Sequence, residues 1–132
     1  MDTKELKKKA ERLIKQMRRD RGYLYPEWEL AARMDPDFME AYNALYRRAL
    51  GEGQALNVKY RELIALALLA FRGEHEALVT HIRRAMKFGA TKQEVLEAFE
   101  AAIIPGGALT FLRGLRALLQ IEGEGKSRAE SR

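Results

Sequence analysis

The chain has 132 residues, contains no cysteine and only two histidines, and carries a formal charge of +5. These counts exclude disulfides, zinc–thiolate centres and thiol nucleophiles, and they argue against a histidine-rich metal site. No apolar segment follows the N-terminal charges, and the longest apolar run, residues 63–71, is too short to span a bilayer. We therefore expect a cytoplasmic protein with no membrane partner, long enough for one domain.

The positive charge is confined to one segment. Residues 1–21 hold nine Lys and Arg against four Asp and Glu, whereas the rest of the chain holds fifteen of each kind. The excess therefore lies on a single helix, and a basic helical face is usually a solvated face. We expect no nucleic-acid partner.

Helical periodicity recurs along the whole chain, and strand-like alternation is absent. A first helix is expected over residues 3–20, and a short helix over residues 28–33 follows a connector. The first helix has an apolar stripe made of Leu6, Ala10, Leu13, Ile14 and Met17. Asp35 and Pro36 predict the start of the next helix, because aspartate caps the first amides and proline fits the first helical position. The apolar side of that helix carries Phe38, Met39, Tyr42, Leu45, Tyr46 and Leu50.

Asn57 is expected to cap a helix that reaches Phe71 and is broken by Gly73. Its large apolar residues go almost all the way round the helix: Leu63, Ile64, Leu66, Leu68, Leu69 and Phe71. A helix that is apolar on every face is usually central to its fold or to an oligomer.

Residues 74–88 predict the next helix, with Gly89 as its left-handed cap. A capping box at Thr91 and Glu94 opens a further helix. The last helix is expected over residues 108–121, with these leucines inward: Leu109, Leu112, Leu115, Leu118 and Leu119. Residues 122–132 have the composition of a disordered tail. The sequence thus predicts an all-α domain over residues 1–121, with about six helices and a central apolar helix pair.

The most informative stretch is residues 57–112. It contains Arg61-Glu62-Leu63-Ile64, then Glu74-His75-Glu76-Ala77-Leu78-Val79-Thr80-His81, then Ala85, Gly89-Ala90-Thr91 and Glu94. The order is a helix with a glutamate, then a helix with a histidine, then the motif Ala-x-x-x-Gly-Ala-Thr-x-x-Glu. This order resembles the carboxymuconolactone decarboxylase family, which includes alkylhydroperoxidase D. The resemblance covers roughly half the chain and implies a small all-helical fold.

In the redox branch of that family, the active helix carries Cys-x-x-Cys-x-x-x-His, and a glutamate lies on the preceding helix. The resemblance places that glutamate at Glu62 and that histidine at His81, whereas the two cysteine positions fall on Glu74 and Ala77. A thiol peroxidase cycle needs a thiolate nucleophile and a second, resolving thiol. The resemblance therefore implies a proton-handling pair without peroxidase activity.

The decarboxylase branch needs no cysteine pair, and its chemistry is the loss of a carboxylate from a lactone acid, helped by acid–base groups and without a cofactor. At i, i+3 and i+7, Glu74, Ala77 and His81 share one helix face, on which Ala77 leaves room for a small molecule. A carboxylate beside an imidazole in an apolar pocket forms an acid–base pair. We therefore expect catalytic roles for His81, Glu62 and Glu74, and substrate binding by Ala77 and by Arg61, Arg83 or Arg84.

The same residues have structural explanations. Glu62 can pair with a buried arginine, His81 can be a hydrogen-bonded core histidine, and Glu74 is favoured in a first helical turn by the helix dipole. Two functions therefore stay open. One is a lyase or isomerase that acts on a small organic acid, and the other is a non-catalytic oligomeric scaffold or small-molecule-binding protein.

Two properties of the whole molecule are also expected. A monomer of this size has difficulty covering so much apolar helix surface, and the resemblance implies symmetric assemblies, so we expect a homo-oligomer, a hexamer first and a trimer second. Cysteine is absent, asparagine is scarce, and arginine and glutamate are abundant. This composition is typical of thermophilic proteins.

Overall fold

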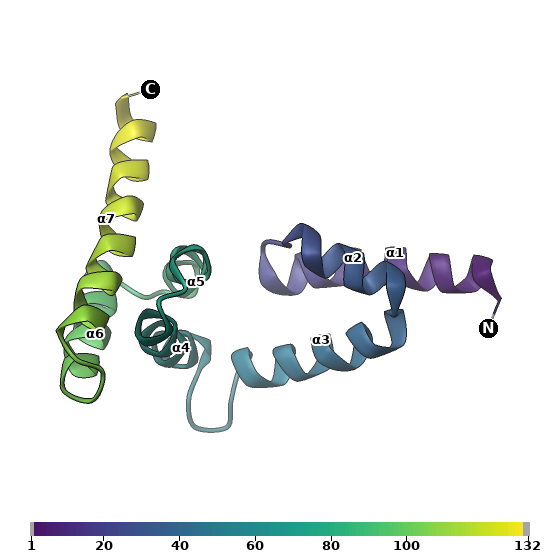
Figure 1. The fold of residues 1–132 in the computed structure, drawn as a ribbon, viewed down its shortest axis with the longest axis horizontal. Helices are drawn as coiled ribbons and strands as arrows, with labels where there is room; N and C mark the ends of the chain where they lie inside the picture. Colours follow the sequence, from purple (N-terminus) through teal and green to yellow (C-terminus); the bar gives the residue numbers. More distant parts are fainter. Residues whose placement is uncertain (1, 131–132) are drawn as a thin grey trace. The chain divides into compact units, whose positions relative to one another are not determined.

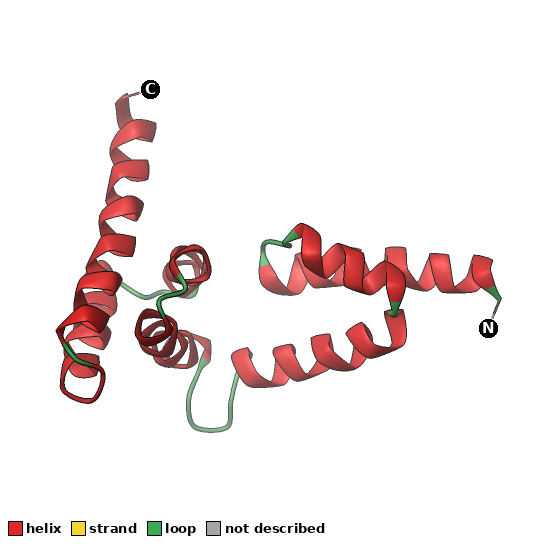
Figure 2. Ribbon diagram, viewed as in Figure 1, coloured by secondary structure: helices red, strands yellow, loops and turns green. Residues whose placement is uncertain are grey.

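The computed structural model describes residues 2–130, which form seven α-helices and no strand (Figures 1 and 2). The prediction of an all-α fold is confirmed, with seven helices in place of about six. Packing contacts divide the chain into two compact units, Met1–Gly51 and Glu52–Arg132, where the sequence predicted one domain over residues 1–121. Each unit encloses a hydrophobic core of its own. No helix in the described part is long and apolar enough to cross a membrane.

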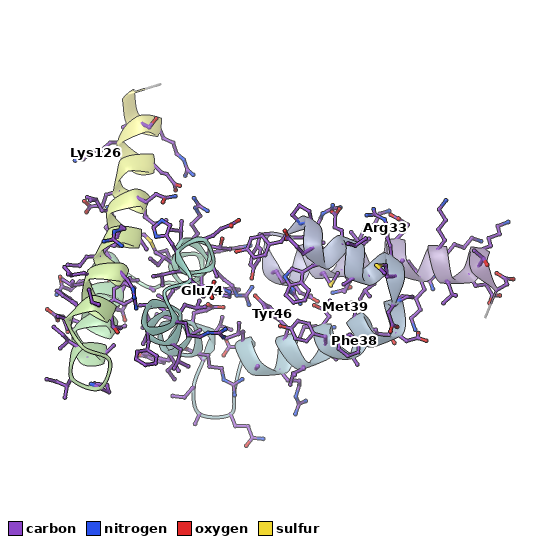
Figure 3. The ribbon with its side chains drawn as sticks, in the orientation of Figure 1. Arg33, Phe38, Met39, Tyr46, Glu74 and Lys126 are labelled. Atoms are coloured by element: carbon purple, nitrogen blue, oxygen red, sulfur yellow. The ribbon has the colours of Figure 1, made fainter. Side chains whose placement is uncertain are left out.

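The first unit has three helices: α1 (Thr3–Arg21), α2 (Pro26–Met34) and α3 (Pro36–Leu50). The Asp35 side chain accepts a hydrogen bond from the Phe38 amide at 3.2 Å, and Pro36 lies in the first turn, as predicted. The core of this unit consists of Leu13, Ile14, Met17, Ala32 and Met39. Phe38, the residue before Met39, points away from this core (Figure 3) and is 67% exposed. The expected apolar side of α3 is therefore only partly buried.

Arg21 is buried inside this unit, with 3% of its surface exposed. Its guanidinium carbon lies 5.2 Å from the ring centre of Trp28, 5.6 Å from that of Tyr42 and 4.1 Å from that of Tyr46. Its Nη2 donates to Oδ1 of Asn43 at 3.5 Å. Aromatic faces attract a cation, and hydrophobic periodicity cannot predict an arginine among them.

The second unit has four helices: α4 (Val58–Arg72), α5 (His75–Lys87), α6 (Lys92–Gly106) and α7 (Ala108–Glu130). Their starts follow the predicted caps. The Asn57 side chain accepts from the Tyr60 amide at 3.2 Å. Thr91 and Glu94 each accept a hydrogen bond from the other's amide at 3.0 Å, which is the reciprocal capping box.

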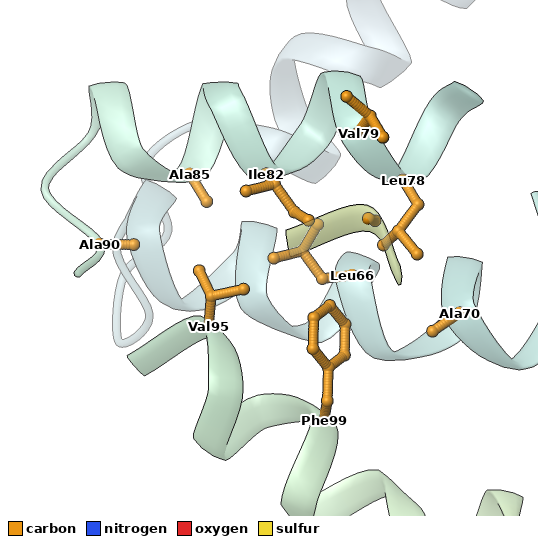
Figure 4. Packing of buried hydrophobic residues seen from close by; sticks show 10 residues of the cluster. Leu66, Ala70, Leu78, Val79, Ile82, Ala85, Ala90, Val95 and Phe99 are labelled. Atoms are coloured by element: carbon orange, nitrogen blue, oxygen red, sulfur yellow. The ribbon is translucent and has the colours of Figure 1, made fainter. Parts of the chain in front are cut away.

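Helix α4 lies at the centre of the second unit and packs against α5, α6 and α7. Figure 4 shows Leu66 of α4 between Ile82 of α5 and Phe99 of α6, and none of the three has measurable exposure. Helix α7 approaches the same core through Gly114, where a Cβ atom would lie 2.4 Å from the Phe99 ring. Glycine is therefore required at that position for α7 to pack this closely.

Helix α7 differs most from its prediction. It continues to Glu130, where the composition predicted a disordered tail from residue 122; residues 131–132 lie outside the described range. Two ion pairs tie the extension to neighbouring helices. Lys92 Nζ lies 3.5 Å from Glu122 Oε1, and Arg83 Nε donates to Glu124 Oε2 at 3.2 Å.

The leucines of α7 were expected to point inward, and three of them do not. Leu109, Leu112 and Leu119 are 64%, 51% and 68% exposed. The fully buried residues of α7 are small, namely Thr110, Gly114 and Ala117, and the larger Phe111, Leu118 and Ile121 pack beside them, partly buried. Small residues allow the helix backbones to approach closely at these positions.

Candidate active site

Glu62 lies in the buried row of α4. This row, at a spacing of four residues, consists of Val58, Glu62, Leu66 and Ala70. Glu62 has no exposed surface. A carboxylate in an otherwise apolar row is costly unless charged or polar partners satisfy it.

Two residues of α5 supply those partners. His81 Nδ1 lies 2.8 Å from Oε2 of Glu62, and Arg84 Nε donates to Oε1 at 2.5 Å. The His81 side chain is 12% exposed and that of Arg84 is 7% exposed. The two residues are three apart on one helix, so both reach the same carboxylate. We refer to Glu62, His81 and Arg84 as the Glu62 cluster.

The cluster fixes the orientation of the imidazole. The guanidinium of Arg84 is cationic at any working pH, so it balances the charge of the Glu62 carboxylate. The carboxylate then accepts the Nδ1 proton of His81, and Nε2 is the ring nitrogen that faces away from Glu62. Phe88 covers the other side of Arg84, with its ring centre 4.9 Å from the guanidinium carbon.

The other expected site residues lie elsewhere. Glu74 is exposed at the start of α5 (Figure 3), and its side chain makes no capping bond. Ala77 is half-buried on α5. Arg61 lies against the loop before α4, where a Cβ atom added to Gly53 would be 2.5 Å from its Nη2. Successive residues of a helix are about 100° apart around its axis. Arg61, one residue before Glu62, therefore points to a different face of α4.

The structure thus joins two of the three expected catalytic residues and adds Arg84 to them. The sequence assigned Arg84 to substrate binding and left the arginine partner of Glu62 unnamed. The spacing of three residues between His81 and Arg84 could have indicated this partner, because it puts both side chains on the same face of the helix. Whether Glu74, Ala77, Arg61 or Arg84 contacts a substrate stays a prediction.

Two cavities on the second unit lie away from the cluster. A groove of about 720 Å³ runs between α4 and α6, lined mainly by apolar side chains. A smaller hollow of about 420 Å³ is lined by His75, Arg116, Leu119 and Gln120, with His75 Nε2 2.8 Å from Gln120 Oε1. Neither cavity includes Glu62 or His81. Among residues 2–130, no three His, Asp or Glu side chains lie together as a metal site.

The sequence profile of the carboxymuconolactone decarboxylase family matches residues 36–120. An uncharacterized protein of Methanocaldococcus jannaschii is 27% identical over 96 residues, which cover 73% of this chain and 89% of that protein. Two crystal structures are similar in fold. A Burkholderia xenovorans LB400 protein, provisionally named a carboxymuconolactone decarboxylase, superposes with a TM-score of 0.77 at 27% identity, over 93% of this chain and 98% of its own. The apo form of a carboxymuconolactone decarboxylase family protein from Legionella pneumophila superposes with a TM-score of 0.68 at 25% identity. The match covers 82% of this chain and 96% of that protein.

Proposed function

Since the chain belongs to the carboxymuconolactone decarboxylase family, we propose that it is a cofactor-free lyase that removes a carboxylate from a small organic acid or lactone. In this proposal His81 transfers the proton and Glu62 positions His81. The supporting observation is the 2.8 Å contact between His81 Nδ1 and a carboxylate with no exposed surface. Arg84 keeps that carboxylate in place from the opposite side.

The proposed step is a decarboxylation followed by protonation. The bond between the substrate carbon and its carboxylate breaks, carbon dioxide leaves, and the electron pair stays on the substrate as an enolate conjugated with the lactone. Protonated His81 then donates one proton from Nε2 to a carbon of this enolate, which restores a neutral lactone ring, and His81 recovers a proton from solvent before the next turnover. Glu62 stabilises the charged imidazole through Nδ1, which is the contribution expected of an orienting carboxylate.

The test compares two histidines of the same helix. The wild type, His81→Gln and His75→Gln are assayed for carbon dioxide release from carboxymuconolactone, the compound in the family's name. His81→Gln is expected to lose about 100-fold or more of kcat, the usual contribution of a general acid. His75→Gln is expected to keep wild-type activity, because His75 is hydrogen-bonded to Gln120 in the hollow on α5 and α7, away from Glu62. Equal activity of all three folded proteins would contradict the proposal.

A second candidate is a non-catalytic family member. The observation in its favour is that both Glu62 oxygens already have side-chain partners, while neither cavity described above reaches them. On this alternative, Glu62→Gln lowers stability but the wild type releases no carbon dioxide from lactone acids. On the proposed function, the wild type is active and Glu62→Gln loses activity at temperatures where it is still folded.

A further inference from the structure

We propose that α1 carries a binding surface for the phosphate backbone of a double-stranded nucleic acid, bound without regard to base sequence. The proposal goes beyond the proposed function, because α1 belongs to the first unit and the Glu62 cluster to the second. Composition alone favoured a solvated face for these charges and no nucleic-acid partner. The arrangement of the cations along the helix is the observation that favours a bound polyanion.

Five cations form one straight row along α1. They follow one another at spacings of four, four, three and four residues, and all are exposed: Lys4, Lys8, Arg12, Lys15 and Arg19. At about 100° per residue, they lie within about 80° of one another around the helix axis. No other residue of Thr3–Arg21 falls within that arc, although Glu5 and Glu11 border it on its two sides. We refer to the five cations as the α1 row.

The α1 row lies opposite the packed side of its helix. Helices α2 and α3 both pack against α1, whose buried residues are Ala10, Leu13, Ile14, Met17 and Arg21. The mean direction of these residues is roughly 180° from that of the row. A long, straight partner can therefore contact all five cations without displacing another helix of the first unit.

The charges of the row are not neutralised within residues 2–130. None of the five cations makes an ion pair there, whereas the neighbouring Lys9 pairs with Asp37 at 2.5 Å. Arg19 Nη2 donates to Oε1 of Gln16 at 2.8 Å, and this neutral acceptor leaves the arginine charge in place. Like charges four residues apart on a helix repel each other, and this cost recurs along the row. A bound anion would remove the cost.

The length of the row matches a nucleic-acid backbone. Its first and last members are fifteen residues apart, which is about 22 Å along a helix. A B-form duplex carries one phosphate per strand for about every 3.4 Å of its axis, which makes about six phosphates per strand over that length. Neutralising such phosphates releases condensed counterions, and this release supplies most of the sequence-independent affinity for nucleic acids.

Other anionic partners fit the row less well. Single-stranded nucleic acids are held largely by aromatic side chains on which the bases stack, and the row contains only lysine and arginine. A helix that lies on a membrane buries an apolar face among the lipids. The apolar face of α1 is already used, because Leu13, Ile14 and Met17 pack in the core of the first unit.

The test measures how binding depends on salt. The full chain is titrated against a fluorescein-labelled DNA duplex of mixed sequence, and fluorescence anisotropy is recorded between about 50 and 200 mM KCl. The logarithm of the binding constant should fall linearly with the logarithm of the salt concentration. The expected slope is about −0.9 for each phosphate contacted, or about −4.5 for one row. Unlabelled duplexes of different base composition should compete equally, because contacts to phosphates carry no sequence information.

Removing three of the five cations tests the row itself. In the triple variant Lys8→Gln, Arg12→Gln and Lys15→Gln, the salt slope should fall to about two fifths of the wild-type value, because the slope scales with the number of phosphates contacted. The three residues are exposed, and glutamine has nearly the helix propensity of lysine and arginine. The variant should therefore fold, which circular dichroism checks.

The matched control removes three exposed cations of the second unit: Arg72→Gln, Lys87→Gln and Lys126→Gln. Both triple variants lower the net charge by three, so an interaction that depended only on net charge would respond equally to them. The control should bind the duplex with the wild-type slope.

Four results would overturn the proposal. The first is no binding of the wild type to the duplex at the lowest salt concentration, and the second is the same slope for both triple variants. The third is a clear preference among duplexes of different base composition. The fourth is binding to vesicles of phosphatidylserine and phosphatidylcholine that is tighter than binding to the duplex and lost in the triple variant of the row, which would assign the row to a membrane surface.

Discussion

Both carboxylate oxygens of Glu62 are hydrogen-bonded to side chains of α5, deep inside the second unit. Taking a carboxylate and a guanidinium out of water costs several kcal/mol for each ion, and their mutual attraction offsets this cost only while both are present. The stability of the unit should therefore respond far more to the loss of one partner than to the loss of a surface pair.

Arg84→Met should lower the free energy of unfolding by about 3–5 kcal/mol, because it leaves the Glu62 charge buried without its cation. The adjacent Arg83→Met should cost about 1 kcal/mol or less, since Arg83 forms an exposed pair with Glu124. Urea denaturation followed by circular dichroism measures both values. Equal losses for the two variants would show that the Arg84 pair is no more important than a surface pair.

The absence of cysteine has its own consequence. The purified protein should show no thiol-dependent reduction of an organic hydroperoxide, because it has neither an attacking nor a resolving thiol. A coupled assay with a dithiol donor measures this, with His81→Ala as the control. Turnover of the wild type above that control would refute the expectation.

At the candidate site, residue spacing and resemblance predicted His81 and Glu62, which the structure joins. The partner arginine could not be chosen from sequence, because Arg61 and Arg84 differ only in which helix face they occupy once the helices pack. Glu74 was grouped with His81 on one helix face, but a shared face does not determine how deeply a side chain is buried. Glu74 is the N-cap residue of α5, just before the first turn, and it is exposed.

At the level of whole helices, starts were predictable where a side chain caps the first amides. Asp35, Asn57 and Thr91 each accept the expected amide hydrogen bond. The end of α7 was not predicted, because its partners on α5 and α6 are distant in sequence. Three of the five leucines of α7 that were expected inward are exposed, and the close approach of α7 to Phe99 at Gly114 could not be predicted from periodicity.

The start of α6 gives a pH-dependent prediction. The Lys59 ammonium and the Thr91 amide hold the pKa of Glu94 below its usual value of 4.5. A carboxyl group whose pKa is lower in the folded state than in the unfolded state stabilises the fold at any pH above its unfolded-state pKa. This contribution is lost as the pH falls through the folded-state pKa. Glu94→Gln should therefore be less stable than the wild type at pH 7, and the difference should vanish at a pH well below 4.5.

Thermal melts of the wild type and Glu94→Gln across this range test the sign of the effect. Glu97→Gln is the control, since Glu97 is an exposed residue of the same helix. A difference between wild type and Glu94→Gln that grows as the pH falls would contradict the assignment of Lys59 as the partner of Glu94.

For the molecule as a whole, periodicity predicted the all-α class, because nearly every window repeats at the helical spacing. The division into two units was not predictable, since both halves have similar helical patterns and no long linker separates them. Helix α4 reads as apolar on every face because one side packs in the core, while the large apolar residues of another side are exposed, namely Tyr60, Ile64, Leu68 and Phe71.

We also expect high thermal stability. Ion pairs join α4 to α6, α6 to α7 and α5 to α7 through Lys59–Glu94, Lys92–Glu122 and Arg83–Glu124. Ion pairs between elements become more effective as temperature rises, because the cost of removing water from charges falls. Calorimetry should give an unfolding midpoint above about 65 °C, the upper end of the range for mesophilic domains. A midpoint of about 45–65 °C would contradict this expectation.

The central claim is that His81, oriented by Glu62, supplies the proton in a decarboxylation without thiols. Turnover of carboxymuconolactone in D₂O, followed by proton NMR, tests it most directly because it records both the rate and the origin of the new hydrogen. We predict that the wild type places one deuteron on a single face of the carbon that takes up the proton, and that His81→Gln loses the rate and that selectivity. Unchanged rate and selectivity in folded His81→Gln, or no turnover by the folded wild type, would contradict the account.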